Sequence, residues 1–326
     1  MKLVNYDEKY LPEIVSFWNR NLKNKRNYFS VTSEILKTRI FEKKSLTGSF
    51  NPAHFLIATD QKSIMAVLHF GIFPINVCKA VYPNWQKEDQ GYIAFILVDE
   101  KHRRKGIGTA LFENALKSVE NCSEIILDGQ CINPFYGNMF MPSSPFFGTP
   151  EGISVEWDDV ATLSFFKKFN YKPRYKAVEL ILKTNTVVRR PLNLFKNSLE
   201  LNGLEMQITK QHIPELGFPL DELCKSNDSY NFESIVCLIK NVAVADIIYY
   251  PMNEVDKKKY AIYKTEVSEN FHGKGIGNNL LNMACERMIE CGAHIIEVVT
   301  VEELSPDAIK LYTKFGFKPD QYWAIF

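Results

Sequence analysis

The feature that most constrains the fold of this chain is an internal duplication. The residues Lys-Gly-Ile-Gly at positions 105–108 recur at 274–277. A strand-like apolar run precedes each copy, and a stretch with apolar residues three and four apart follows it, which is the spacing of an amphipathic helix. These flanking segments lie at 91–99 and 110–119 in the first copy and at 260–268 and 280–288 in the second. The sequence therefore predicts two copies of one strand–turn–helix unit.

The agreement between the two halves extends well beyond this unit. Each half begins with a short strand, an amphipathic helix and a hairpin, and each ends with a strand, a helix and an aromatic segment. The matched segments are 3–4, 11–18, 55–58 with 64–70, 125–127 and 169–173 in the first half, and 206–208, 213–223, 235–238 with 242–248, 295–299 and 315–319 in the second. We expect residues 178–182 and 322–326 to form the strands that close the two copies.

The duplication also predicts the domain organisation. A length of 326 residues favours two domains over one. We place the first domain at 1–183, a polar connector around Arg189-Arg190-Pro191 at 184–201, and the second domain at 202–326.

The first half carries an insertion. From Gly108 to Tyr171 is 63 positions, whereas the matching interval from Gly277 to Phe317 is 40. The extra residues, about 23 of them, fit at about 130–157, where loop-forming residues alternate with aromatic ones. A long loop in a compact domain is usually functional or mobile. Two interpretations stay open: its aromatic side chains cover a binding cleft, or they only pack on their own domain.

Composition and charge exclude several classes of function. Lys and Arg number 39 against 38 Asp and Glu, so the chain lacks the basic excess of nucleic-acid-binding proteins. The first residues do not resemble a signal peptide, and no apolar run approaches the length that spans a bilayer. The seven Cys form no C-x-x-C pair, and the six His show no zinc-binding spacing. We therefore expect a cytoplasmic protein with reduced cysteines, no metal, and no membrane or nucleic-acid partner.

The duplicated glycines indicate an anion-binding turn. Gly106 and Gly108, like Gly275 and Gly277, stand between a predicted strand and a predicted helix. Glycine permits positive φ and close backbone approach, so such a turn can aim successive N–H groups at one phosphate. The positive end of the helix dipole adds to this attraction.

Two familiar nucleotide motifs do not fit the turn. A Walker loop needs G-x-x-x-x-G-K-[ST], which neither copy has, and a dinucleotide fingerprint needs a third glycine where Leu111 and Leu280 stand. The basic residues Arg103, Arg104 and Lys105 strengthen the prediction of a phosphate ligand in the first copy. A basic run of this kind can also be an ordinary solvated surface.

The segments 98–111 and 267–277 resemble motif A, R/Q-x-x-G-x-G/A, of the GNAT (GCN5-related N-acetyltransferase) superfamily. Residues 308–317, AIKLYTKFGF, resemble the family's later A-x-x-L-Y-x-K-x-G-F segment. The resemblance covers nearly the whole chain. It implies an α/β (α+β) chain of two tandem GNAT acyl-CoA N-acyltransferase folds, each a mixed, largely antiparallel sheet flanked by helices.

The resemblance implies a role for particular residues. The diphosphate of acetyl-CoA would lie on the motif A amides, and the pantetheine arm would pair with the splayed end of the preceding strand, where a backbone N–H can polarise the thioester carbonyl. The residues assigned in this way to acetyl-CoA (CoA) binding are Leu97, Val98, Arg103, Arg104, Lys105, Gly106, Ile107, Gly108, Thr109, Val267, His272, Gly273, Lys274, Gly275, Ile276, Gly277 and Asn278.

Several residues are candidates for proton transfer. Tyr312 occupies the position of the family's usual acid, and a phenol is protonated at neutral pH. It could instead be a packed helix aromatic. Glu266 is a candidate base by its position alone, and an ordinary strand carboxylate is the alternative; His54, His69 and Asp128 are further positions of this kind.

The two copies depart from the family pattern in different places. Phe166 stands where the second copy has Tyr312, so the first copy lacks the usual acid, although Tyr136 in the insertion could supply a proton. In the second copy His272 takes the Arg/Gln position and carries a weaker charge near pH 7. The first copy is therefore better suited to bind the cofactor, and the second copy has the better candidate acid.

The expected function is that of an acetyl-CoA-dependent N-acetyltransferase acting on a primary amine of a small molecule or peptide. Two alternatives stay open: a non-catalytic acyl-CoA binding or sensing protein, and a protein with one active domain beside a structural one. The acceptor and the oligomeric state cannot be read from the sequence, because one fold and one cofactor site serve many acceptors.

Overall fold

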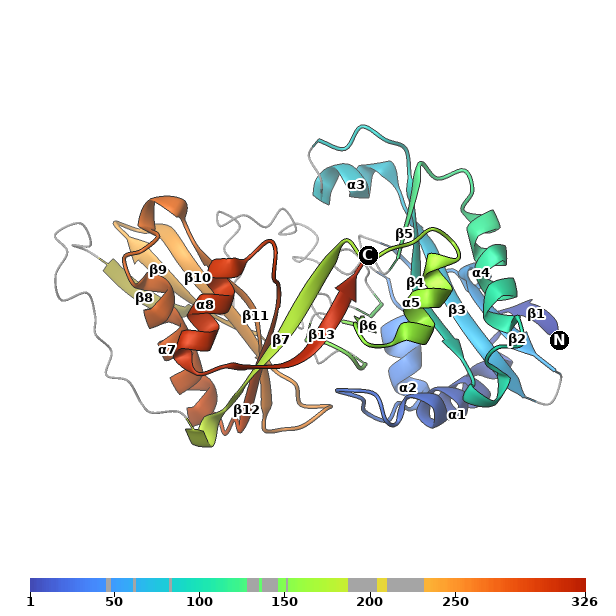
Figure 1. Ribbon diagram of the computed structural model, residues 1–326, viewed down its shortest axis with the longest axis horizontal. Coiled ribbons are helices and arrows are strands. Elements are labelled where there is room, and N and C mark those ends of the chain that lie inside the picture. The colour runs from blue at the N-terminus through green and yellow to red at the C-terminus, as the bar shows by residue number, and fades with distance from the viewer. Residues whose placement is uncertain are drawn as a thin grey trace. The chain divides into compact units, whose positions relative to one another are not determined.

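A computed structural model describes residues 1–44, 48–60, 63–81, 84–127, 135–136, 146–150, 152–186, 204–209 and 232–326 of the chain (Figure 1). These residues fall into two compact units, one of residues 1–136 with 146–148 and one of residues 149–326. No helix in the described ranges is both long and apolar enough to cross a bilayer. The predicted helix at 213–223, most of the connector at 184–201 and Asp128 lie outside the described residues.

The first unit is built on a sheet with the strand order β1-β2-β3-β4-β5. β1 to β4 are antiparallel, and β5 runs parallel to β4. Its elements are β1 (Lys2–Asn5), α1 (Leu11–Leu22), α2 (Ser33–Leu36), β2 (Phe55–Thr59), β3 (Ile64–Phe73), α3 (Ile75–Val81), β4 (Gln90–Val98), α4 (Ile107–Ser118) and β5 (Glu124–Leu127). Short turns of helix at Glu8–Tyr10, Lys37–Phe41, Pro52–His54 and Glu100–His102 connect them.

The helices of the first unit form where the apolar spacing predicts them. α1 buries Leu11, Ile14, Trp18 and Leu22, which lie three and four residues apart along one face. Asp99, just past β4, receives hydrogen bonds from Arg20 of α1, so this helix is held at the end of the strand that leads into the glycine turn.

The second unit is built on a larger sheet with the strand order β6-β13-β7-β12-β11-β10-β9-β8. Its elements are β6 (Val155–Glu156), α5 (Val160–Lys167), β7 (Tyr175–Lys183), β8 (Leu204–Thr209), β9 (Glu233–Ile239), β10 (Val242–Pro251), β11 (Lys259–Val267), α7 (Ile276–Glu290), β12 (Ile295–Val301), α8 (Pro306–Phe315) and β13 (Lys318–Ile325), with short 3-10 turns at Thr184–Thr186 and Glu269–Phe271. β11 and β12 are the parallel pair, at the same place in the element order as β4 and β5.

One strand differs from its prediction. We expected residues 178–182 to close the first copy, but β7 lies between β12 and β13 in the sheet of the second unit and is antiparallel to both. Leu180 is register partner to Val298 on one side and to Pro319 on the other. The physical reason is that the centre of β7 is mostly apolar and buried. A position between two strands gives hydrogen-bond partners to both of its backbone edges and removes these side chains from water. The boundaries proposed at 183 and 202 stay a prediction, but the strand that precedes 183 completes the second sheet.

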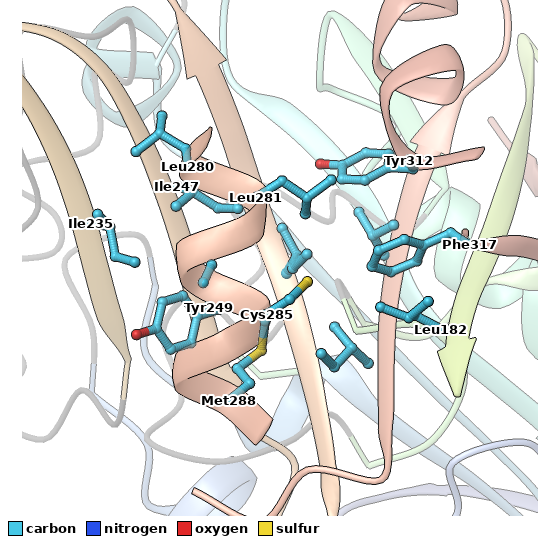
Figure 2. Packing of buried hydrophobic residues seen from close by; sticks show 14 of the residues in the cluster. Leu182, Ile235, Ile247, Tyr249, Leu280, Leu281, Cys285, Met288, Tyr312 and Phe317 are labelled. Carbon is cyan, nitrogen blue, oxygen red and sulfur yellow. The ribbon is translucent and has the colours of Figure 1, made fainter. Parts of the chain in front are cut away.

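The core of the second unit lies between its sheet and the helices α7 and α8 (Figure 2). Leu280, Leu281 and Met288 of α7 pack with Tyr249 of β10, and Tyr312 of α8 packs beside Phe317. The predicted hairpin of β9 and β10 is confirmed, and Lys240 and Asn241 at its turn both adopt positive φ. A core of this kind fixes the start of α7, where the second glycine motif stands.

Candidate functional site

Each predicted motif A begins at the end of a bulged strand. In the first unit, His69 pairs with Phe95 and Phe70 pairs with Ile93, so Ala94 of β4 is left over. In the second unit, Ile248 pairs with Lys264 and Tyr249 with Ile262, so Tyr263 of β11 is left over. Both extra residues stand 12 positions before the first glycine of the motif. A bulge bends its strand and re-aims the residues that follow.

The parallel strand pair of the second unit splays apart after the bulge. β11 pairs with β12 only from Lys259 to Ile262, although β12 continues to Val301. From Lys264 to Val267, the strand pairs of β11 in the described chain are with β10. In the first unit the described pairs of β4 with β5 end at Ile93, the matching position.

The glycine turns have the same backbone conformation in both units. Gly106 has φ +80 and Gly275 has φ +81, and each is the residue that precedes its helix, α4 or α7. Arg104 with φ +63 matches Gly273 with φ +74. A Cβ placed on Gly106, Gly273 or Gly275 would meet no described atom within 4 Å, so the space in front of both turns is open.

The helices that follow the turns begin without a cap. The N-cap residues are Gly106 and Gly275, and neither α4 nor α7 has a side-chain cap hydrogen bond there. The first N–H groups of a helix have no partner inside the helix, and together with the helix dipole they attract an anion. The turns thus fit a diphosphate at 106–109 and at 275–278, which are the positions predicted from the motif.

The Arg/Gln position of the motif is occupied in the same way in both units. Arg103 Nε donates to the carbonyl of Val98 at 3.2 Å, and His272 Nε2 donates to the carbonyl of Val267 at 2.7 Å. Both side chains thus fold back on the last residue of the bulged strand. His272 therefore replaces Arg103 in position and in hydrogen bonding, although not in fixed charge.

Tyr312 lies beside the splayed segment. It is 3% exposed, and its hydroxyl donates to Thr265 Oγ1 of β11 at 3.0 Å. The phenol is therefore held one residue from Glu266, the candidate base, whose side chain is 44% exposed. Phe166, the residue that matches Tyr312 in the sequence of the first half, is buried on α5 of the second unit and packs against Phe165 and Phe326.

Aromatic residues of the insertion are buried in the first unit. Tyr136 is 1% exposed, its ring stacks near Trp18, and its hydroxyl lies 2.9 Å from His69 Nδ1. Burial raises the pKa of Tyr136 well above its usual value and lowers that of His69 to about 3. Phe146 and Phe147 also pack on Trp18. Tyr136, Phe146 and Phe147 of the insertion thus pack into the first unit, whereas its last residues form β6 of the second sheet.

A cavity of about 260 Å³ lies in the first unit beside β3. It is lined by His54, His69, Tyr92 and Phe135 among others, and burial lowers the pKa of His54. The described residues hold no cluster of three His, Cys, Asp or Glu side chains that could bind one metal ion.

Sequence reasoning missed three residues near these turns. Asp99 is buried and accepts a hydrogen bond from Arg20. Burial raises the pKa of Asp99, but the hydrogen bonds from Arg20 and the Lys101 N–H outweigh burial and hold this pKa below its usual value. Asp246 and Lys264 lie on β10 and β11 next to Glu266. Only strand register brings these side chains together, and no local motif marks them.

Both halves of the chain match one family of known proteins. Residues 21–134 and 204–317 each match the model of the acetyltransferase (GNAT) family. No curated protein matches the chain.

Three solved structures share the fold over 99% of this chain. A tandem GNAT protein from the clavulanic acid biosynthesis pathway is 13% identical over 96% of its own chain, with a TM-score of 0.62. A GCN5-related N-acetyltransferase from Sphaerobacter thermophilus is 11% identical over 93% of its chain, with a TM-score of 0.59. The third structure contains the glucosamine N-acetyltransferase region of a fungal multi-domain GH3 β-N-acetylglucosaminidase; it is 14% identical with a TM-score of 0.66, and this chain spans only 37% of it. At such identities the likeness extends to the fold alone.

Proposed function

The chain belongs to the acetyltransferase (GNAT) family, and from this premise we propose that it transfers an acetyl group from acetyl-CoA to the primary amine of a small molecule or peptide. One observation carries the proposal: each unit sets an open, positive-φ glycine turn and an uncapped helix directly after a bulged strand. This arrangement offers main-chain donors for a diphosphate.

The residues that would hold acetyl-CoA are those of the two turns. The N–H groups at 106–109 and 275–278 would face the diphosphate. In the second unit, the end of β11 beyond its last pair with β12 at Ile262 can pair with the pantetheine arm. When bound, acetyl-CoA supplies an activated thioester. Arg103 adds a fixed positive charge at the first turn.

Proton transfer is proposed for the second unit. Tyr312 holds a proton on its phenol oxygen, oriented by the bond to Thr265, and can give it to the departing thiolate. Glu266, on the same splayed segment, is the proposed base for the acceptor amine. At the position of Tyr312 the first half of the sequence has Phe166, whose ring has no such proton and which lies on α5 of the second unit. We therefore propose that transfer occurs in the second unit and that the first has a binding or structural role. The proposed compartment is the cytoplasm.

The proposal is tested by release of CoA thiol from acetyl-CoA with a panel of primary amines. Gly106→Glu and Gly275→Glu each place a carboxylate in the space where the diphosphate would lie, at the first and second turn respectively. We expect Gly275→Glu to abolish thiol release and Gly106→Glu to leave transfer in the second unit. Loss of activity only in Gly106→Glu would assign catalysis to the first unit, and binding of CoA without transfer to any amine would favour a sensing protein.

A further inference from the structure

Three charged side chains lie together on the splayed segment of the second unit. Thr265 faces α8, where it meets Tyr312. Because side chains alternate along a strand, its neighbours Lys264 and Glu266 point to the opposite face. Asp246 of β10 is the register partner of Glu266 and lies on that same face.

The three groups form a compact set with a net negative charge. Lys264 Nζ lies 2.9 Å from Glu266 Oε2 and 3.9 Å from Asp246 Oδ1. Two carboxylates thus face one ammonium. Glu266 is the exposed member, so solvent reaches the set at its end of the strand.

Asp246 is buried without a hydrogen bond. Its exposed fraction is 0%, and in the described part of the chain neither carboxylate oxygen accepts a hydrogen bond. A buried carboxylate without donors is costly. Burial raises its pKa to about 6, Lys264 opposes this rise, and Glu266 adds to it. Asp246 therefore lacks N–H donors, and with Lys264 as its one cation the set is short of one positive charge.

The matching positions of the first unit show that the fold does not require these charges. By register, Val67 takes the place of Asp246, and by the spacing from the glycine turn Phe95 and Leu97 take the places of Lys264 and Glu266. All three are buried and apolar, and Phe95 packs on Trp18. The same bulged strand pair is thus built with an apolar face in one unit and a charged face in the other.

We propose that Asp246 and Glu266 form the acceptor site of the second unit and bind the ammonium group of a small cationic amine. This inference rests on the proposed function and adds the substrate class to it. A primary ammonium carries three N–H donors, which Asp246 lacks, and the one positive charge of which the set is short. Lys264 Nζ competes with the substrate for the same two carboxylates.

The test uses the full chain and 1,4-diaminobutane as the probe, with 1,4-butanediol as its uncharged counterpart. Calorimetry measures the Kd of the probe, and thiol release from acetyl-CoA measures KM and kcat. We expect Asp246→Asn and Glu266→Gln to raise the Kd and KM of the diamine roughly tenfold or more. We expect Lys264→Met to lower both, because it removes the competing cation. Glu290→Gln removes the same unit of charge from an exposed position on α7 and is the matched control.

The signs of these effects decide the outcome. The inference would be overturned if Asp246→Asn and Lys264→Met both weakened diamine binding. It would also be overturned if 1,4-butanediol bound as tightly as 1,4-diaminobutane. Thermal unfolding shows whether each variant is folded. If Asp246→Asn or Glu266→Gln does not fold, the direction of the change in the diamine Kd of Lys264→Met decides the outcome. If the diamine binds as expected but no amine is acetylated, the proposed function fails while the ammonium site stands; if amines are acetylated with unchanged KM in Asp246→Asn, the reverse holds.

Discussion

Replacement of Gly275 by Ala separates the role of the glycine turn in binding from its role in folding. Gly275 has φ +81, and a Cβ there would meet no described atom within 4 Å. The substitution therefore introduces backbone strain without a clash inside the protein. A non-glycine residue in the left-handed region costs about 1–2 kcal/mol. For a unit of this size, this lowers Tm by roughly 2–8 °C.

Gly292 offers a matched control in the same unit. It has φ +93, it also faces open space among the described residues, and it follows the far end of α7. Gly292→Ala should lower Tm by a similar amount. Only Gly275→Ala places a methyl group in front of the N–H groups at the start of the helix. A hydrogen bond to a charged group contributes about 1.5–3 kcal/mol, so loss of one raises the Kd for CoA at this turn roughly 10- to 100-fold.

The assay combines calorimetric titration of CoA with thermal unfolding. Gly106→Ala tests the first turn in the same way, and the double variant Gly106→Ala with Gly275→Ala removes the contribution of both turns. CoA binding of wild-type affinity and stoichiometry in the double variant would refute the reasoning. So would an equal loss of CoA affinity in Gly275→Ala and Gly292→Ala, because strain alone would then explain the effect.

Three further predictions follow from single contacts. Tyr312→Phe should lower kcat while KM for acetyl-CoA stays within about twofold, measured by steady-state thiol release; a larger rise in KM than fall in kcat would indicate a packing role. Trp323→Phe removes the indole N–H that donates to the buried Glu179 at 3.0 Å, and it should lower the free energy of unfolding in urea by about 1.5–3 kcal/mol. Trp18→Phe serves as the comparison, because the indole N–H of Trp18 has no hydrogen-bond partner in the described chain and this variant loses packing alone. Asp246 has a folded pKa of about 6, above its value of 3.8 in the unfolded chain, so its contribution to stability is complete only well below pH 3.8 and is lost as pH rises through 6. Relative to Asp246→Asn, the free energy of unfolding of the wild type should fall by roughly 2–3 kcal/mol between pH 4 and 7.5, and parallel pH profiles of the two proteins would contradict this.

The sequence predicts most of the local structure around the glycine turns. Gly106 and Gly275 mark positive φ, the apolar spacing that follows marks α4 and α7, and the positions of Arg103 and His272 within the motif correspond to side chains with matching hydrogen bonds. Each of these features depends on a few consecutive residues. Local backbone preference and helix periodicity therefore suffice to predict them.

The interior of the insertion is harder to predict. Aromatic residues in a loop are compatible with a cleft cover or with packing on the domain, and no periodicity distinguishes the two. The buried contacts of Tyr136 with His69 and Trp18 join residues far apart in the chain. Such contacts depend on how the whole unit closes.

By itself, then, the sequence determined that the chain is a tandem repeat and where each repeat turns from strand to helix, and it predicts an anion at the main-chain groups of these turns. Tertiary structure alone decided that β7 completes the second sheet, and that Asp246 of an apolar strand meets Lys264 and Glu266. The physical reason is that strand pairing is non-local. A strand's own residues set which side chains share a face, but the register with its neighbours sets what each of those side chains meets.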